Sequence, residues 1–288
     1  MQNIYCWPTA QAIYPDRNNK SYAAKRFRYN LRSFLNRSRI KAFERFVNQN
    51  PYLIPLLNAR PNFSYPIAHR FLDKRFSGKK RLQEMCENLR FLPERLAQLG
   101  ADSVLEKNIV LATVMDDYEL RLGINTFQPM EGFWNIELFH KANDELIYLL
   151  TFGKIEDALL IAVIQGPNQE GSKEMVKQLT KVCHGLRPAY LMVEVMKMVT
   201  DALGYSRLLG IPQKYQNKSR FIKSSSFVVD YDAIFGESKG TLKAYWELPL
   251  ALESRDLEEI PSKKRSMYRK RYAMLHDIAE QVKTALHA

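Results

Sequence analysis

The feature that most constrains this chain is a change in the period of its apolar residues near Gly100. Before Gly100, apolar side chains recur every three or four residues, as they do along one face of a helix. After it, Leu120 and Leu122 alternate with polar or small neighbours, which is the period of a half-buried strand. We therefore expect an α+β protein, with a basic helical region at residues 1–100 and an α+β domain at residues 101–288.

The N-terminal region is predicted to hold two basic helices. The first, at residues 21–50, carries a stripe of apolar residues at helical spacing: Phe27, Leu31, Phe34 and Leu35. Lys and Arg fill its other faces. The second helix, at about 71–99, should end at Gly100, since glycine is the usual residue at a helix C-terminus.

The region after Gly100 begins with strands. The alternation around 120–124 and 134–138, followed by apolar runs at 146–152 and 158–164, predicts a four- or five-stranded antiparallel meander. We expect the turn between the last two strands at residues 153–157.

Helices and further strands complete the expected α+β domain. One helix should start near Ser172 as its cap, and another should run from Pro188, a residue suited to the first helical position, to Gly204. Short strands are expected at 208–211, 228–231 and 242–248. A basic helix is expected from Pro261 to the end.

Charge is unevenly distributed along the chain. Residues 1–100 hold 19 Lys and Arg against 6 Asp and Glu, residues 263–271 add six positive charges, and residues 101–262 have a net charge of −6. Basic ends of this kind either face water as solvated helix surfaces or attract a polyanion such as a lipid headgroup or a phosphate. Nucleic acid is the less favoured partner, because no motif of a known nucleic-acid reader accompanies the charge.

Cysteine usage and hydropathy point to a cytoplasmic protein. Cys6, Cys86 and Cys183 are odd in number and have no CxxC spacing, which fits a reducing compartment. The first residues lack the pattern of a secretory signal, and no apolar run approaches the ~20 residues that span a bilayer. We expect a cytoplasmic protein that can make peripheral contact with the inner membrane.

Several short motifs occur in the order typical of one bacterial family. These are Gln165-Gly166-Pro167, the HGLRP sequence at 184–188, and the basic run at 263–272. With them the chain resembles the VirK/YbjX family. The resemblance implies a role in virulence, in envelope and lipopolysaccharide integrity and in resistance to cationic peptides, and it brings no established reaction.

The order of antiparallel strands, helix and short strand also looks like the core of a GNAT-type acyltransferase, in which a splayed strand and the next helix hold coenzyme A. On this analogy Gln165, Gly166, His184, Gly185 and Arg187 are the candidate residues for coenzyme A or another acyl thioester. Glycine permits close backbone approach, and a helix N-terminus with an arginine attracts phosphate. The alternative is a plain turn at each motif, with Arg187 paired to an acidic neighbour.

Acyl transfer would need a base and an acid. Glu137, on a predicted middle strand, could deprotonate the acceptor, and Tyr190 or Tyr231 could protonate the leaving thiolate. Each could equally be an ordinary polar strand position or a core tyrosine. The five histidines show no metal-ligand spacing, so no metal site is predicted.

Two functional hypotheses follow. One is an acyltransferase acting on an envelope precursor or a protein. The other is a non-enzymatic accessory protein whose basic ends dock on an anionic membrane or a partner protein.

Overall fold

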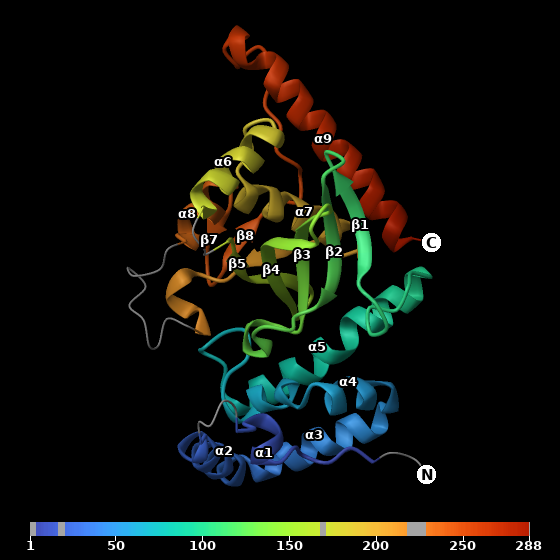
Figure 1. Ribbon diagram of the computed structural model, residues 1–288, viewed down its shortest axis with the longest axis vertical. Helices are drawn as coiled ribbons and strands as arrows, with labels where there is room; N and C mark the ends of the chain where they lie inside the picture. The colour runs from blue at the N-terminus through green and yellow to red at the C-terminus, as the bar shows by residue number, and fades with distance from the viewer. Residues whose placement is uncertain (1–3, 17–20, 168–170, 218–228, 288) are drawn as a thin grey trace.

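The computed structural model describes residues 4–16, 21–167, 171–217 and 229–287. Figure 1 shows the N-terminal helices gathered at one end of the molecule, with a sheet and its covering helices occupying the rest. The fold is α+β, as predicted.

Helices dominate the first 100 residues. They are α1 (Ala10–Ile13), α2 (Ala23–Leu35), α3 (Arg37–Gln49), α4 (Ile54–Ala59) and α5 (Gly78–Leu99), with 3-10 turns η1 (Pro51–Leu53), η2 (Pro61–Phe63) and η3 (Tyr65–Ala68). The predicted helix at 21–50 is wrong as a single element, because it breaks at Asn36. There the Asn36 side chain donates to the Arg32 carbonyl at 2.8 Å, and such bonding competes with helix continuation.

The second predicted helix, α5, begins later than residue 71. Ser77 caps it by accepting a hydrogen bond from the Lys80 amide at 3.3 Å. Its predicted end is confirmed: Gly100 has φ 75°, the left-handed conformation that glycine adopts without strain.

Eight strands form one sheet in the part of the chain that the structure describes, in the order β1-β2-β3-β4-β5-β6-β8-β7. The strands are β1 (Ile109–Val114), β2 (Tyr118–Ile124), β3 (Trp134–His140), β4 (Glu145–Ile155), β5 (Ala158–Gln165), β6 (Leu208–Gly210), β7 (Thr241–Leu242) and β8 (Trp246–Leu248). The predicted meander is confirmed as the five antiparallel strands β1 to β5. Its last turn is tighter than predicted, because β4 continues to Ile155 and Glu156 turns the chain with φ 54°.

Helices follow and flank the meander. They are α6 (Ser172–Val182), α7 (Pro188–Ala202), α8 (Tyr231–Glu237) and α9 (Ser262–Leu286), with 3-10 turns η4 (Pro129–Glu131) and η5 (Gln213–Tyr215). Ser172 is the first helical residue of α6 rather than its cap, since Gly171 occupies the cap position with φ 83°. Pro188 begins α7 as predicted.

The two later strand predictions have different outcomes. The predicted strand at 228–231 is wrong where it can be checked: Tyr231 opens helix α8, whose cap Asp230 accepts from the Ala233 amide at 2.9 Å. Val228 lies outside the described residues. The segment at 242–248 forms the short hairpin of β7 and β8.

Helix α7 is the central buried helix. Of its 15 residues, 12 are buried, and it packs against β4, β5 and α9 (Figure 1). Most buried apolar residues form one large cluster that includes Phe43 of α3 as well as Leu191 of α7, and Tyr29, Tyr65 and Ala68 form a second, small cluster beneath α2. The division near residue 100 stays a prediction.

Strands β5 and β6 are parallel and pair over three residues, Leu159–Ile161 against Leu208–Gly210. Beyond this point the β5 carbonyls turn to other partners. The Ala162 carbonyl accepts from Gln216 Nε2 at 3.3 Å, and the Ile164 carbonyl accepts from Tyr231 Oη at 2.9 Å. Because β6 ends at Gly210, side chains take its place along this edge of β5.

Among the described residues, the structure contains no helix whose length and hydropathy suit it to cross a membrane.

Candidate functional site

A cleft of about 560 Å³ lies at the N-terminal end of α7, between the end of α8, the segment at 249–255 and the first turns of α9. We call it the α7 cleft. Its lining includes Arg187, Tyr190, Glu194, Lys239, Arg255 and Arg271. Three of the predicted site residues, Gly185, Arg187 and Tyr190, belong to it.

The floor of the α7 cleft is a buried ion pair. Lys197 Nζ lies 2.6 Å from Glu194 Oε1, and the two side chains are 3% and 6% exposed. Glu194 also accepts from the Glu253 amide at 2.8 Å, and Lys197 donates to the Ala251 carbonyl at 3.3 Å. These bonds compensate the desolvation of both charges and hold the 249–255 segment against α7.

One wall is the turn between α6 and α7, held by Arg271 of α9. His184 and Gly185 both have left-handed backbone conformations, with φ 51° and 79°. The buried Arg271 guanidinium donates to the His184 carbonyl at 3.2 and 3.0 Å and to Glu253 at 3.1 and 3.3 Å. Burial, with the nearby Lys270 and Arg271 charges, lowers the pKa of His184, so its imidazole is neutral at physiological pH.

The rim of the α7 cleft carries exposed cations. Arg187 is the residue before α7, and its guanidinium carbon lies 5.2 Å from the centre of the Tyr190 ring. No acidic residue in the described part of the chain forms an ion pair with Arg187, Lys239 or Arg255. The turn predicted before Pro188 is therefore present without the acidic partner that was expected for Arg187.

Tyr190 is the one predicted acid that lines the cleft. Its hydroxyl donates to Glu237 Oε2 at 2.5 Å. Burial and the adjacent Glu237 carboxylate raise the pKa of Tyr190 to about 12. The phenol therefore stays protonated at neutral pH and acts as a hydrogen-bond donor.

The residues predicted around the end of β5 form a different group. Gln165 Nε2 donates to Glu131 at 3.2 Å, and a Cβ on Gly166 would lie 2.7 Å from the Tyr148 ring. Tyr231 is buried, its hydroxyl binds the Ile164 carbonyl, and burial raises its pKa. None of Gln165, Gly166 and Tyr231 lines the α7 cleft.

The predicted cofactor residues are thus divided between two places in the chain. Gln165 and Gly166 precede α6, whereas His184, Gly185 and Arg187 follow it. An 11-residue helix is about 16 Å long, so the two groups belong to opposite ends of α6. His184 contributes its backbone carbonyl to the wall and does not line the cleft.

Glu137 lies on β3 within a second polar cluster, outside the α7 cleft. It is 6% exposed and accepts from Asn135 Nδ2 at 2.9 Å, and burial raises its pKa while Asn135 and Arg121 oppose the shift. Next to it, Asn135 Oδ1 and Thr151 Oγ1 are buried without a hydrogen-bond partner in the described structure. We call Glu137, Asn135 and Thr151 the β3 cluster.

The basic run of α9 is only partly free for a polyanion. Arg271 donates to the His184 carbonyl in the cleft wall, and Arg265 donates to the Ile260 and Glu258 carbonyls at 2.9 and 3.1 Å. The remaining four cations are exposed: Lys263, Lys264, Arg269 and Lys270.

Sequence reasoning missed the charged residues that build the cleft floor. Glu194 and Lys197 stand three residues apart within the otherwise apolar stretch at 191–199, a spacing that places them together on one helix face. That signal was available in the sequence. Glu253, which joins Glu194 and Arg271, carries no comparable local signal.

Comparison with known proteins places this architecture in a family. The family model described as "Protein of unknown function (DUF535)" matches residues 18–284. An uncharacterized protein of Haemophilus influenzae is 61% identical, over 99% of this chain and 97% of its own length. A Mannheimia haemolytica protein named membrane protein LapB is 65% identical, over 78% of this chain and 100% of its own length.

More distant similarities extend the comparison. The Escherichia coli protein YbjX is 25% identical, over 81% of this chain and 75% of its own length. Among solved structures, a mutant cAMP-binding acyltransferase from Mycobacterium smegmatis covers 80% of this chain and 66% of its own, at 9% identity and a TM-score of 0.29. A TM-score this low supports no conclusion about activity. The match over residues 18–284 and the similarity to YbjX confirm the resemblance seen in the motifs, and the chain belongs to the DUF535 family.

Proposed function

We propose that the α7 cleft binds the phosphate groups of an acyl thioester such as acyl-coenzyme A, and that the protein transfers the acyl group to an amine or hydroxyl acceptor. The observation that carries the proposal is the set of three exposed cations without ion-pair partners in the described structure, Arg187, Lys239 and Arg255, around one cleft. Unpaired cations converging on a concave site are suited to a polyanionic ligand.

The electrostatics of the cleft favour an anion over a cation. The carboxylates of Glu194 and Glu253 are neutralised by Lys197 and Arg271. The N-terminus of the 15-residue helix α7 adds the positive end of a helix dipole beside Arg187. A phosphate at the rim would therefore meet a net positive field.

Tyr190 and Glu237 supply the groups that acyl transfer requires. The acceptor's N or O would form a bond to the thioester carbonyl carbon while its proton passes to Glu237. As the carbon–sulfur bond breaks, Tyr190 would give its proton to the departing thiolate and regain one from Glu237 through their hydrogen bond. Glu237 thus takes the role first considered for Glu137, which does not line this cleft.

The acceptor remains an expectation from the family resemblance. An envelope precursor or a protein amine would fit the VirK/YbjX setting. A virulence or lipopolysaccharide role belongs to the same proposal.

Isothermal titration of the purified chain with coenzyme A and long-chain acyl-coenzyme A tests binding. We expect Arg187→Ala and Lys239→Ala each to weaken binding about tenfold, the usual effect of removing one charged hydrogen bond. Lys181→Ala is the matched control, since Lys181 is exposed at the end of α6 and does not line the cleft. Absence of binding by any thioester would contradict the proposal.

Turnover is tested separately with Tyr190→Phe. This variant keeps the ring beneath Arg187 and removes the proton donor, so thioester affinity should persist while acyl transfer falls by about 100-fold or more. Equal turnover in wild type and variant would remove Tyr190 from the reaction.

A further inference from the structure

Helix α2 presents its apolar face to solvent. Its four large apolar residues are 69%, 48%, 65% and 68% exposed, at Phe27, Leu31, Phe34 and Leu35 respectively. Their spacing puts them on one face of the helix. An amphipathic helix on a globular protein normally packs such a face against the core, whereas the apolar face of α2 points away from the core.

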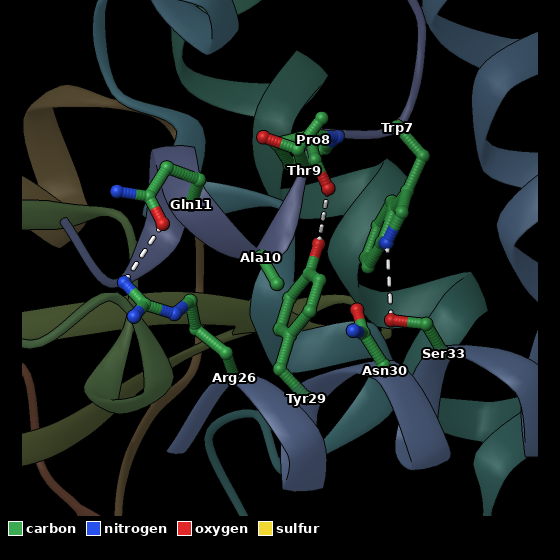
Figure 2. A pocket seen from close by; sticks show the side chains of 9 residues that line it. All are labelled: Trp7, Pro8, Thr9, Ala10, Gln11, Arg26, Tyr29, Asn30 and Ser33. Carbon is green, nitrogen blue, oxygen red and sulfur yellow. Dashed lines mark hydrogen bonds between the residues drawn. The ribbon is translucent and has the colours of Figure 1, made fainter. Parts of the chain in front are cut away.

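The opposite face of α2 is fixed to the protein by polar and aromatic contacts. Tyr29 is buried, and its hydroxyl donates to the Pro8 carbonyl at 2.6 Å. Figure 2 shows Tyr29 beside Trp7, whose indole nitrogen donates to Ser33 at 3.2 Å. Arg32 donates to Tyr65 Oη at 2.5 Å.

These contacts determine the orientation of the helix. Rolling α2 to bury Phe27 and Phe34 would withdraw Tyr29 and Arg32 from their partners and leave buried polar groups unsatisfied. The exposure of the apolar face is therefore built into the fold, and a large exposed apolar face marks an interaction surface.

Exposed cations lie along one edge of the apolar face. Residues 21–50 contain eight Lys and Arg and one acidic residue, Glu44. On α3, Arg37, Lys41 and Arg45 are exposed at four-residue spacing, which aligns them as a stripe on one face. The Arg37 guanidinium carbon lies 5.5 Å from the centre of the Phe34 ring, so this stripe begins at the edge of the apolar face.

We propose that this surface, the α2 face with the α3 stripe, docks on an anionic lipid bilayer, with Phe27, Leu31, Phe34 and Leu35 in the interface and the cations against the headgroups. Phenylalanine and leucine flanked by Lys and Arg are the composition of interfacial helices. A 13-residue helix is about 20 Å long and would lie in the plane of the membrane. Charge disfavours a second copy of the chain as the occupant, because pairing two such faces would bring their arginines together.

The position of α2 in the molecule suits this role. Figure 1 places α2 and α3 at one end of the molecule, with the first turns of α9 at the other. Docking through α2 would leave the first turns of α9, and the part of the α7 cleft that Tyr268 and Arg271 line, at a distance from the membrane. The proposal is independent of the acyltransferase proposal, since neither surface shares residues with the other.

Flotation of the full chain with vesicles tests the proposal. We expect binding to vesicles of phosphatidylcholine with phosphatidylglycerol, and at least about tenfold weaker binding to phosphatidylcholine alone, because each cation near an anionic surface contributes on the order of a fewfold in affinity. The triple variant Phe27→Gln, Leu31→Gln, Phe34→Gln should lose at least about tenfold in affinity for the anionic vesicles. Phe127→Gln, at an exposed phenylalanine elsewhere, is the matched control.

Tryptophan emission locates the contact. In Phe34→Trp, added anionic vesicles should shift the emission to shorter wavelength relative to wild type, and in Phe127→Trp they should not. Three outcomes would overturn the proposal: no binding to anionic vesicles, loss of binding on neutralising Lys263, Lys264, Arg269 and Lys270 with the α2 triple variant unaffected, or self-association of the chain that the triple variant abolishes.

Discussion

Helices α2 and α7 both carry an apolar face, which is exposed to solvent in α2 and buried in α7. In α7 the apolar face and even the charged Glu194 and Lys197 are buried. In α2 a tyrosine is buried while Phe27 and Phe34 face solvent. The difference shows that hydrophobic periodicity defines a face, whereas the neighbouring elements decide whether that face becomes core or contact surface.

The buried ion pair of α7 should give the largest effect on stability. Lys197→Met would leave the Glu194 carboxylate buried without its counter-charge, and the free energy of unfolding should fall by about 3–5 kcal/mol in urea denaturation. The matched control is Lys177→Met, which removes an exposed pair with Glu174 and should change stability by less than about 1 kcal/mol. Similar losses of unfolding free energy in both variants would contradict the burial of the Glu194–Lys197 ion pair.

Two leucines allow the comparison to be made residue for residue. Leu191→Ala in α7 removes a fully buried side chain and should cost about 2–5 kcal/mol, whereas Leu31→Ala in α2 should change the free energy of unfolding by less than about 0.5 kcal/mol. Both are measured by urea denaturation. A large loss in Leu31→Ala would mean that α2 packs its apolar face inward.

A substitution in the wall of the α7 cleft should have a smaller effect on stability. Gly185→Ala would place a Cβ 3.0 Å from Arg271 Nη2 on a backbone with φ 79°, and we expect a loss of about 1–2 kcal/mol. Thermal unfolding measures it. Gly171→Ala has the same left-handed strain with nothing within 4 Å of its Cβ, so the excess loss at Gly185 reports the contact with Arg271.

The smallest expected effect is a pH dependence at Glu137. Its pKa is raised in the folded protein, so the stability that its neutral form contributes is present at acidic pH and is lost as pH rises through the raised pKa. Glu137→Gln should therefore be more stable than wild type at neutral pH, by on the order of 1 kcal/mol or less, and equal to it below about pH 4. Thermal unfolding at both pH values measures this, and a variant less stable at neutral pH would show that the ionised carboxylate is the form the fold uses.

Local signals in the sequence predicted the meander and several helix boundaries. The alternation around Leu120 and Leu122 defined the meander, Gly100 ended α5 and Pro188 began α7, because each depends on backbone geometry within a few residues. Tyr231 was placed in a strand because its apolar neighbours resemble one, while the Asp230 cap that starts α8 went unrecognised.

The candidate site was harder to predict from the sequence. Arg187 and Tyr190 lie three residues apart and were each predicted for a separate role, but their cleft is completed by Glu237, Lys239 and Arg255, which are distant in sequence. Tertiary packing alone brings these segments to α7. It also sets Glu137 apart on β3, which no spacing rule could indicate.

Hydrogen–deuterium exchange of the full chain, alone, with anionic vesicles and with acyl-coenzyme A, tests most directly whether the two surfaces have separate roles. Vesicles should slow exchange within residues 21–50 and leave the 185–190 and 249–255 segments unchanged, and acyl-coenzyme A should do the reverse. Vesicle protection at the cleft, or acyl-coenzyme A protection confined to α2, would contradict this division of the molecule.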